Sequence, residues 1–453
     1  MADLEGICRK MISEDRRIEE ILQKLVDEIL FYKKIDRDLA ERLAAAVVKE
    51  VKMSLKIPDD DKIRRIIYYP VAGVTAGQQG LGSRGEGDFF AHRKIAEIIS
   101  SSGLRAFLDV RAHDDAGAVN VGGAGLIVAS VDGIHSRLSE YPFLAGFHAT
   151  RAALRDVYVK GARPVGILID IHLADDADIG KLFDFIAGCT TVSKLAGIPI
   201  IGGSTLRIGG DMVIGTRISG CVVAIGVSVV PGYLLKRQNI RPGDLIICTE
   251  GSGGGTITTT AIFSGNFDVI LETLNLQFIK ACEAIFRPNI ITKIHAASDW
   301  TNGGLRGDLN EICKTVGVGV VVEEEKVRKL MNPKVLEMLD SLNIDYLGVS
   351  MDALLLFAPP ENVDEIINVI RSTGVKVDVI GEVTENAGES ILIKNGKKIP
   401  LMPKYRESAY TEIKKVVGEL APPNKEEIFK RAARAAQEAI EKVKFVEKLI
   451  MER

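Results

Sequence analysis

One short stretch, residues 113–135, constrains the fold of this chain more than any other. Residues 126–131 (LIVASV) form an apolar run with β-branched side chains, which is typical of a buried strand. The glycine-rich turn at residues 122–125 (GGAG) separates this run from a shorter run at residues 118–121. The pattern therefore predicts a β-hairpin.

Acidic side chains gather at the open end of this predicted hairpin. If the turn closes so that Val121 faces Leu126, then Asp115 faces Asp132, with Asp114 one step away. Like charges on directly opposed residues repel, and a divalent cation would remove the repulsion because hard cations take carboxylate oxygens. The hairpin thus predicts a Mg²⁺-type site. The alternative is that these aspartates cap turns.

The bulk composition narrows the class of partner. A net charge of −3 over 453 residues gives no reason to expect nucleic acid or an anionic membrane. No apolar run is long enough to span a bilayer, and the charged start is not typical of a secretory signal. The six cysteines are scattered without a CxxC pair, as in a reduced protein. We therefore expect a cytoplasmic protein.

The chain divides into four expected segments. Residues 1–62 carry apolar side chains at helical spacing and predict a small helical domain for packing or assembly. Residues 63–230 begin with a strand-like run at 63–69, and residues 231–403 follow a Pro-Gly break. Residues 404–453 are polar and end in a long amphipathic helix at 425–451, which we expect to serve packing or assembly.

Three glycine-bearing segments are candidates for phosphate binding. Gly82, Gly85 and Gly87 belong to a loop that could close its N–H groups over phosphate or could be a mobile surface loop. Gly253 and Gly254 follow a predicted strand and precede a helix, which suits an anion site or a plain tight turn. The third segment is a polar turn at a strand end, Gly203-Ser204-Thr205.

Another polar segment follows residue 295 (HAASDWTNGGL). Asp299 precedes a glycine pair and a predicted helix from Leu305. It could approach a ligand, or it could cap that helix.

The order of these segments resembles the aminoimidazole ribonucleotide synthetase (PurM-like) superfamily across about residues 84–385. That superfamily includes thiamine-monophosphate kinase, selenophosphate synthetase and a hydrogenase-maturation dehydratase. The motifs that carry the resemblance are Asp114-Asp115-Ala116 (GDDAA), Ser130-Val131-Asp132 (S/T-T-D), Leu154-Arg155-Asp156 with Gly161-Ala162-Arg163-Pro164 (N-x-x-D and M-G-A-x-P), Gly202-Gly203-Ser204-Thr205 (GGDT), Arg241-Pro242-Gly243-Asp244 (RPGD) and the segment from Asp299 to Leu305 (D-x-T-x-G-G-L). The chain is most similar to the uncharacterised synthetase-related branch.

The resemblance implies an α+β fold of two PurM-like halves, with extra helical segments at both ends of the chain. The N-terminal half would form a β-barrel in a homodimer, and the C-terminal half would be an α/β domain. ATP or a related nucleotide would lie in a cleft, with Mg²⁺ or Mn²⁺ holding its phosphates. Carried over position by position, the metal candidates are Asp114, Asp115, Asp132, Asp156 and Asp299.

Two departures from the family pattern limit what it implies. Ser204 stands where the family has an acidic metal ligand, so the number of ions stays open. The features that distinguish the characterised members are also absent from this sequence. The resemblance therefore predicts a chemistry and leaves the substrate open.

The leading functional interpretation is a metal-dependent enzyme acting on a nucleotide or other phosphate ester, by phosphoryl transfer or by hydrolysis as in a phosphatase or ATPase. Asp132, His135 and Arg155 are its candidate catalytic residues, and His135 could instead make a structural hydrogen bond. The alternatives are an ATP-dependent kinase or synthetase acting on a small molecule, and a nucleotide- or metal-binding assembly protein without turnover.

Overall fold

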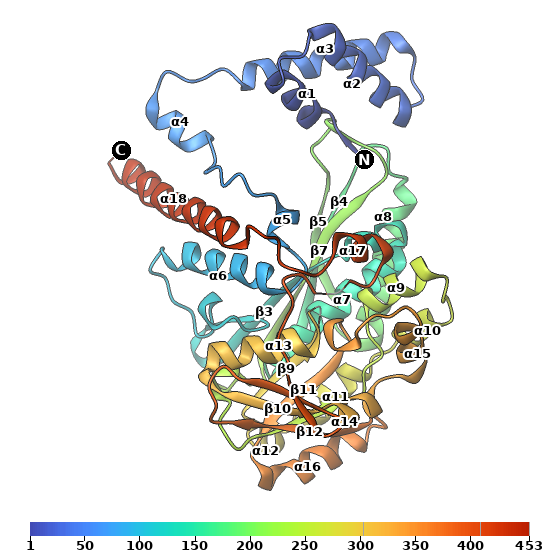
Figure 1. Cartoon of the computed structure of the whole chain (residues 1–453), viewed down its shortest axis with the longest axis vertical. Helices are drawn as coiled ribbons and strands as arrows, with labels where there is room; N and C mark the ends of the chain where they lie inside the picture. The colour runs from blue at the N-terminus through green and yellow to red at the C-terminus, as the bar shows by residue number, and fades with distance from the viewer. Residues whose placement is uncertain (302, 408, 453) are drawn as a thin grey trace.

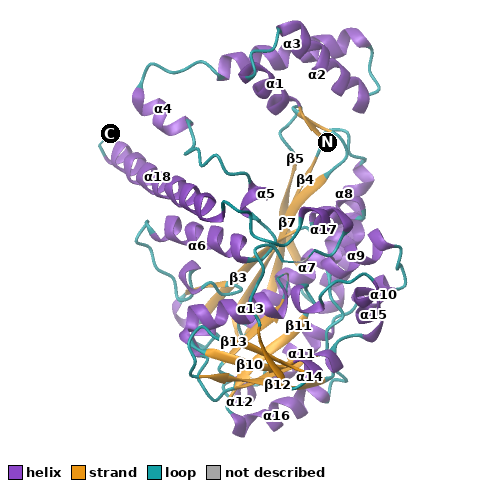
Figure 2. Cartoon of the chain, viewed as in Figure 1, coloured by secondary structure: helices purple, strands orange, loops and turns teal. Residues whose placement is uncertain are grey.

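The computed structural model describes residues 1–301, 303–407 and 409–452. Figure 1 shows a main body of two sheets and their helices, with the N-terminal helices lying at one end of it. Figure 2 shows helices on both sides of the sheets, which confirms the predicted mixed class. The buried apolar side chains form three cores, one in the N-terminal helices and two in the main body.

The N-terminal core lies between three helices with apolar stripes, α1 (Leu4–Ser13), α2 (Ile18–Tyr32) and α3 (Arg37–Ser54). Two short strands attach this bundle to the main body, since β1 (Ala2–Asp3) pairs with β6 (Val213–Ile214). Ile214 belongs to the bundle's own core. The helical prediction for this region is confirmed.

The strand predicted at residues 63–69 is wrong. These residues lie mostly in helix α4 (Asp61–Ile67), whose first turn is capped by the Asp60 side chain. No strand of the described part of the chain pairs with this run. The helix contacts the C-terminal helix instead, where the Arg65 guanidinium lies over the Phe445 ring, and the apolar side chains of the run stay exposed.

The first sheet has five strands in the order β2-β3-β7-β4-β5, antiparallel except for the β4–β5 pair. Its strands are β2 (Gly117–Asn120), β3 (Leu126–Gly133), β4 (Ala162–Leu173), β5 (Ile200–Arg207) and β7 (Ile218–Ser228). Two helices accompany it, α7 (Pro142–Val159) and α8 (Ile179–Ala196), and α7 packs against both β3 and β7. Side chains alternate along β3, so Ser130 and Asp132 share the face that α7 covers.

The hairpin of β2 and β3 exists, but its register differs from the prediction by one residue. Asn120, and not Val121, pairs with Leu126, because Val121 already belongs to the turn. A shift of one residue moves every side chain to the opposite face. Asp115 and Asp132 are therefore not cross-strand neighbours, although both line the same pocket.

The second sheet has seven strands in the order β14-β13-β10-β12-β8-β11-β9, and only β10 and β13 run parallel. Its strands are β8 (Leu245–Thr249), β9 (Ala296–Trp300), β10 (Gly319–Glu323), β11 (Ala353–Ala358), β12 (Val377–Thr384), β13 (Ser390–Lys394) and β14 (Lys397–Pro400). The helices of this half are α9 (Gly255–Ser264), α10 (Val269–Thr273), α11 (Gln277–Ile285), α12 (Pro288–Ile291), α13 (Gly304–Ile312), α14 (Glu324–Leu330), α15 (Pro333–Ser341) and α16 (Pro360–Arg371).

Helix α7 joins the two halves. Its residues are buried almost throughout, and it contacts β3, β4 and β7 of the first sheet as well as β9 of the second. One core accordingly contains side chains from both sheets, while the other fills the far side of the second sheet. The domain boundary near residue 231 stays a prediction. The strands of the first sheet precede this residue and those of the second sheet follow it, but one hydrophobic core contains side chains from both sides.

The C-terminal extension runs back along the body. Residues 401–407 and 409–420, here called the C-terminal strap, include helix α17 (Glu412–Val417). Helix α18 (Lys425–Met451) then packs against α6 (Glu86–Ser100), with the Phe90 and Phe429 rings stacked at 4.1 Å. The short helix α5 (Ala76–Gln79) lies beside it. The helix predicted at residues 425–451 is confirmed.

Two further observations bear on the sequence predictions. None of the helices that the structure describes is long and apolar enough to cross a bilayer. All six cysteines lie in described positions as free thiols, and only Cys221 is not fully buried.

Candidate active site

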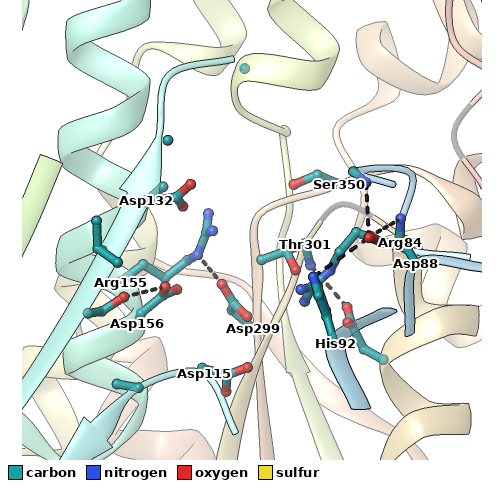
Figure 3. A pocket seen from close by; sticks show the side chains of 18 of the residues that line it. Arg84, Asp88, His92, Asp115, Asp132, Arg155, Asp156, Asp299, Thr301 and Ser350 are labelled. Atoms are coloured by element: carbon teal, nitrogen blue, oxygen red, sulfur yellow. Dashed lines mark hydrogen bonds and ion pairs between the residues drawn. The ribbon is translucent and has the colours of Figure 1, made fainter. Parts of the chain in front are cut away.

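A pocket of about 1040 Å³ opens between the two halves of the body. Its lining comes from the end of β3, one side of α7, the loop before α9, the region from β9 to α13, helix α6 and the C-terminal strap. These elements lie far apart in the sequence and meet because α7 packs against both sheets. Figure 3 shows the acidic part of this pocket.

Four carboxylates with raised pKa values face the pocket: Asp299 and Asp308 are buried, and Asp132 and Asp156 are half-buried. Burial is the main cause of two raised pKa values, that of Asp132, which is raised to about 6, and that of Asp308, which is raised to about 7. Burial also raises the pKa of Asp156 and of Asp299, and mutual repulsion adds to the effect. A bound cation would stabilise the charged form of these carboxylates, which burial and mutual repulsion disfavour.

Arg155 lies among these carboxylates. Its guanidinium donates hydrogen bonds to Asp299 and to Asp352. Those carboxylates outweigh the effect of burial and raise the pKa of Arg155, so it stays charged. In Figure 3 the Arg155 side chain lies between Asp132, Asp156 and Asp299. Asp156 also accepts a hydrogen bond from Ser130 Oγ at 2.7 Å.

Asp114 and Asp115 have a different environment, because buried cations already neutralise them. Lys160 is fully buried, and its Nζ lies 2.5 Å from Asp114 Oδ1 and 3.0 Å from Asp115 Oδ2. Arg237 donates to Asp115 and also to Ser298. Burial alone would raise the pKa of Asp115, but Arg237 and Lys160 lower it to about 2.

The sequence did not indicate several of these residues. Lys160, Arg237, Asp308 and Asp352 have no motif of their own, and their importance comes from complete burial next to opposite charges. The one local signal was for Asp308, an acidic residue three positions after Leu305 and four before Ile312, which places it on the apolar side of the helix that follows Asp299.

His135 makes hydrogen bonds through both ring nitrogens. Its Nδ1 lies 3.1 Å from Thr259 Oγ1, and its Nε2 lies 2.7 Å from the Tyr410 hydroxyl. Burial, followed by the charges of Lys414 and Arg137, lowers the pKa of His135 to about 4. A neutral ring with both nitrogens bonded suits a positioning role, which was one of the two interpretations from the sequence.

Of the glycines predicted to bind a cofactor, Gly82 and Gly254 line the pocket and Gly253 lies beside it. Gly85 and Gly87 serve chain packing, because a Cβ atom would lie 2.5 Å from the Tyr405 carbonyl oxygen or 2.1 Å from that of Gln79. Their small size lets the strap and the loop before α6 approach closely.

The prediction of a turn at Gly203-Ser204-Thr205 is wrong, because the strand that was expected to end before them continues to Arg207, and none of the three lines the pocket of its own chain. These residues lie on the exposed edge strand β5, where Ser204 pairs with Asp170 of β4. A Cβ atom at Gly203 would lie 2.2 Å from the Ile169 carbonyl oxygen, so this glycine allows the two strands to approach. A binding role for the three residues stays a prediction.

The buried Asp308 carboxylate predicts a pH-dependent stability. A carboxyl whose pKa rises on folding favours the folded state when protonated, and this contribution is lost as the pH rises from about 4 through about 7. We expect Asp308→Asn to raise the free energy of unfolding at about pH 8 by roughly 1–3 kcal/mol and to change it little at about pH 4. The Asn oxygen can still accept the hydrogen bond from the Thr301 N–H (3.1 Å).

Denaturant titrations at both pH values measure this effect, with the exposed Asp364→Asn as a matched control. The same pH dependence in Asp308→Asn as in the unchanged chain would contradict the assignment.

Sequence comparison identifies relatives of the chain. The N-terminal domain of AIR synthase related proteins matches residues 113–227, and the C-terminal domain matches residues 241–394. An uncharacterized protein of Methanocaldococcus jannaschii is 50% identical over 100% of this chain and 99% of its own length. A selenide, water dikinase of Myxococcus xanthus is 28% identical over 51% of this chain and 64% of its own length.

Solved structures agree on the fold. Hydrogenase maturation protein HypE in complex with ATP matches with a TM-score of 0.52 and 23% identity, covering 68% of this chain and 97% of that one. Thiamine monophosphate kinase of Aquifex aeolicus matches with a TM-score of 0.51 and 16% identity, covering 67% and 97%. The extent of the domain matches and the full-length relative identify this chain as a member of the AIR synthase-related family, within the PurM-like superfamily.

Proposed function

We propose that this protein is an ATP-dependent enzyme that transfers a phosphoryl group to a small molecule, or activates one, as a kinase or synthetase does. The observation that carries the proposal is a group of three carboxylates with raised pKa values, Asp132, Asp156 and Asp299, which line one pocket of about 1040 Å³. Family members named as a dikinase and a kinase, and a relative solved with ATP, support it.

The donor chemistry of this group fits Mg²⁺ or Mn²⁺, which prefer carboxylate oxygens. Among the residues that the structure describes, no three His, Cys, Asp or Glu side chains already converge as a ligand cage. Arg155 holds Asp299, so an ion would compete with this guanidinium. We assign the ion to Asp132, Asp156 and Asp299, and give Asp114 and Asp115 a structural part because Lys160 and Arg237 already pair with them.

When bound, the ion neutralises phosphate charge and orients the reacting oxygen. The chain's own residues supply the rest. Arg155 is a charged donor within reach of the carboxylates and takes over phosphate contacts as charge develops on the transferred group. Gly254, Gly255 and Thr256 bring the N-terminus of the ten-residue helix α9 to the pocket, where its first amides have no partner within the helix.

Transfer to an acceptor has better support than hydrolysis, because two relatives are named as a dikinase and a kinase, and both names specify a substrate that is phosphorylated. The test is Mg²⁺-dependent ATP consumption by the full chain with candidate acceptors, in which ADP and inorganic phosphate are measured together. ADP formed without an equal amount of phosphate supports a phosphoryl acceptor. Equal amounts without any acceptor would favour hydrolysis and contradict the proposal.

We also propose that two copies of the chain associate through the open face of the first sheet. The side chains of Val131, Val165 and Ile201 are 62%, 52% and 59% exposed on its strands. Apolar residues of this kind on one sheet face mark an interface. We expect the full chain to have the mass of a dimer by light scattering and Val131→Asp to weaken it, whereas Leu271→Asp, exposed on α10, should not. A monomeric parent chain would contradict this.

A further inference from the structure

Two cations in the pocket, Arg137 and Lys414, stand apart from its carboxylates. Neither makes an ion pair with any Asp or Glu in the described part of the chain, whereas Arg155, Arg237 and Lys160 are each paired. Each of the two lies instead on an aromatic ring. The Arg137 guanidinium is 3.6 Å from the centre of the Phe263 ring, and Lys414 Nζ is 4.5 Å from that of Tyr410.

Arg137 and Lys414 act electrostatically on each other and on the neutral ring of His135. Burial, followed by the charge of Arg137, lowers the pKa of Lys414. Both cations contribute to the low pKa of His135, after burial. Holding two like charges partly buried beside one cavity costs free energy, which a bound anion would offset.

The surroundings of the pair also suit an anion. His135 is fixed by Thr259 of α9 and by Tyr410 of the strap, and the ring is packed against the start of α9, since a Cβ atom at Gly255 would lie 3.3 Å from its Cβ. The unpaired first amides of α9 therefore face the same part of the pocket. An anion bound between the start of α9 and His135 would lie near both Arg137 and Lys414. In the described part of the chain, no carboxylate is paired with either cation, so none competes with the anion for it.

We propose that Arg137 and Lys414 form a subsite for a free oxyanion, a phosphate or a carboxylate, carried by the second substrate of the reaction. That the anion belongs to a second substrate rests on the proposed function. That an anion binds here rests only on the arrangement of the residues. Phosphates of the nucleotide would be bound through an ion on Asp132, Asp156 and Asp299. The pocket of about 1040 Å³ is larger than most sites for one small ligand and has room for both.

The C-terminal strap thereby takes part in substrate choice. Lys414 lies on α17, and the strap is held to the body by the pair of Glu407 with Arg306 (3.0 Å) and by the hydrogen bond of Tyr410 to His135 (2.7 Å). The sequence favoured packing or assembly for this extension. Its contact with the pocket assigns it a second task, the recognition of an anionic acceptor.

Binding of inorganic phosphate to the full chain, followed by isothermal titration calorimetry, tests the subsite. We expect Lys414→Met and Arg137→Met each to weaken phosphate binding about tenfold, because each removes one charge-assisted contact. Lys415→Met is the matched control, since Lys415 donates to the Leu342 carbonyl (3.0 Å) and to Glu412 (2.8 Å) and does not line the pocket. Lys414→Gln provides a second variant if the methionine variant folds poorly.

Phosphate affinity that is equal in the parent chain and both variants, or absent from the parent chain, overturns the subsite. Repeating the titration with a saturating Mg²⁺-bound non-hydrolysable ATP analogue separates the two sources of an oxyanion. Retained phosphate binding supports the second substrate, whereas displacement assigns the pair to the nucleotide and overturns the inference. Acetate in place of phosphate shows which oxyanion is preferred. A chain that binds phosphate but no nucleotide contradicts the proposed function and leaves the subsite standing.

Discussion

Replacing Asp132 by asparagine should lower Mg²⁺-dependent ATP turnover at least about 100-fold while the chain stays folded. The position is at the end of β3, on the face covered by α7, and its carboxylate lies beside Asp156, Asp299 and Arg155. Asparagine keeps the shape but removes the charge that an ion requires. Since burial raises the pKa of Asp132 to about 6, loss of this charge should not reduce stability near neutral pH.

The assay compares steady-state ADP formation in the parent chain, Asp132→Asn and the control Asp364→Asn. Asp364 is exposed on α16, away from the open face of the first sheet, and does not line the pocket. Its substitution should leave the rate within a few-fold. Parent-like turnover in a folded Asp132→Asn chain would remove this carboxylate from the proposed ion site.

The second large effect concerns stability, and it arises from Lys160. The ammonium group is fully buried, bonded to Asp114 (2.5 Å) and to the Ala297 carbonyl (2.8 Å), and close to Asp115 (3.0 Å). Removing one partner of a buried pair leaves an uncompensated charge and typically costs about 3–5 kcal/mol. We expect Lys160→Met to lower the free energy of unfolding by about this amount.

Methionine is a suitable replacement because its unbranched side chain is close in length to the aliphatic part of lysine and carries no charge. Steric misfit is therefore minimised. Lys293→Met, which breaks the exposed pair with Glu365, should change stability by less than about 1 kcal/mol. Denaturant titration of both variants decides the matter, and similar losses in the two would contradict a special role for Lys160. Added Mn²⁺ should restore part of the loss, since it would replace the missing ammonium charge beside Asp114 and Asp115, which Arg237 would still contact.

The local patterns predicted much of the fold. Long periodic helices such as α2, α3, α7, α8 and α18 were recognisable because their apolar residues recur at helical spacing. The run at residues 63–69 was misread, because whether IIYY becomes a strand depends on a neighbouring strand that the sequence does not reveal. The register of β2 and β3 was misplaced by one residue because the exact closing bond of a glycine turn is not encoded in composition.

The residues of the candidate site that belong to a sequence motif could be predicted. Asp132, Asp156 and Asp299 were identified from family motifs, and all three line one pocket. Arg155 and His135 were also identified, but their partners Asp352 and Tyr410 were not, because these lie 197 and 275 residues away from them in the sequence. Contacts of that range follow from how α7 and the strap pack, and no local pattern in the sequence records them.

The most direct test of the metal–nucleotide site is a crystal structure of the full chain with Mn²⁺ and a non-hydrolysable ATP analogue, with the ion located by its anomalous scattering. The account predicts Mn²⁺ at about 2.1 Å from carboxylate oxygens of Asp132, Asp156 or Asp299 and from phosphate oxygens of the analogue. Asp114 and Asp115 should still be paired with Lys160 and Arg237. An analogue bound outside this pocket, or an ion on none of those three carboxylates, would contradict it.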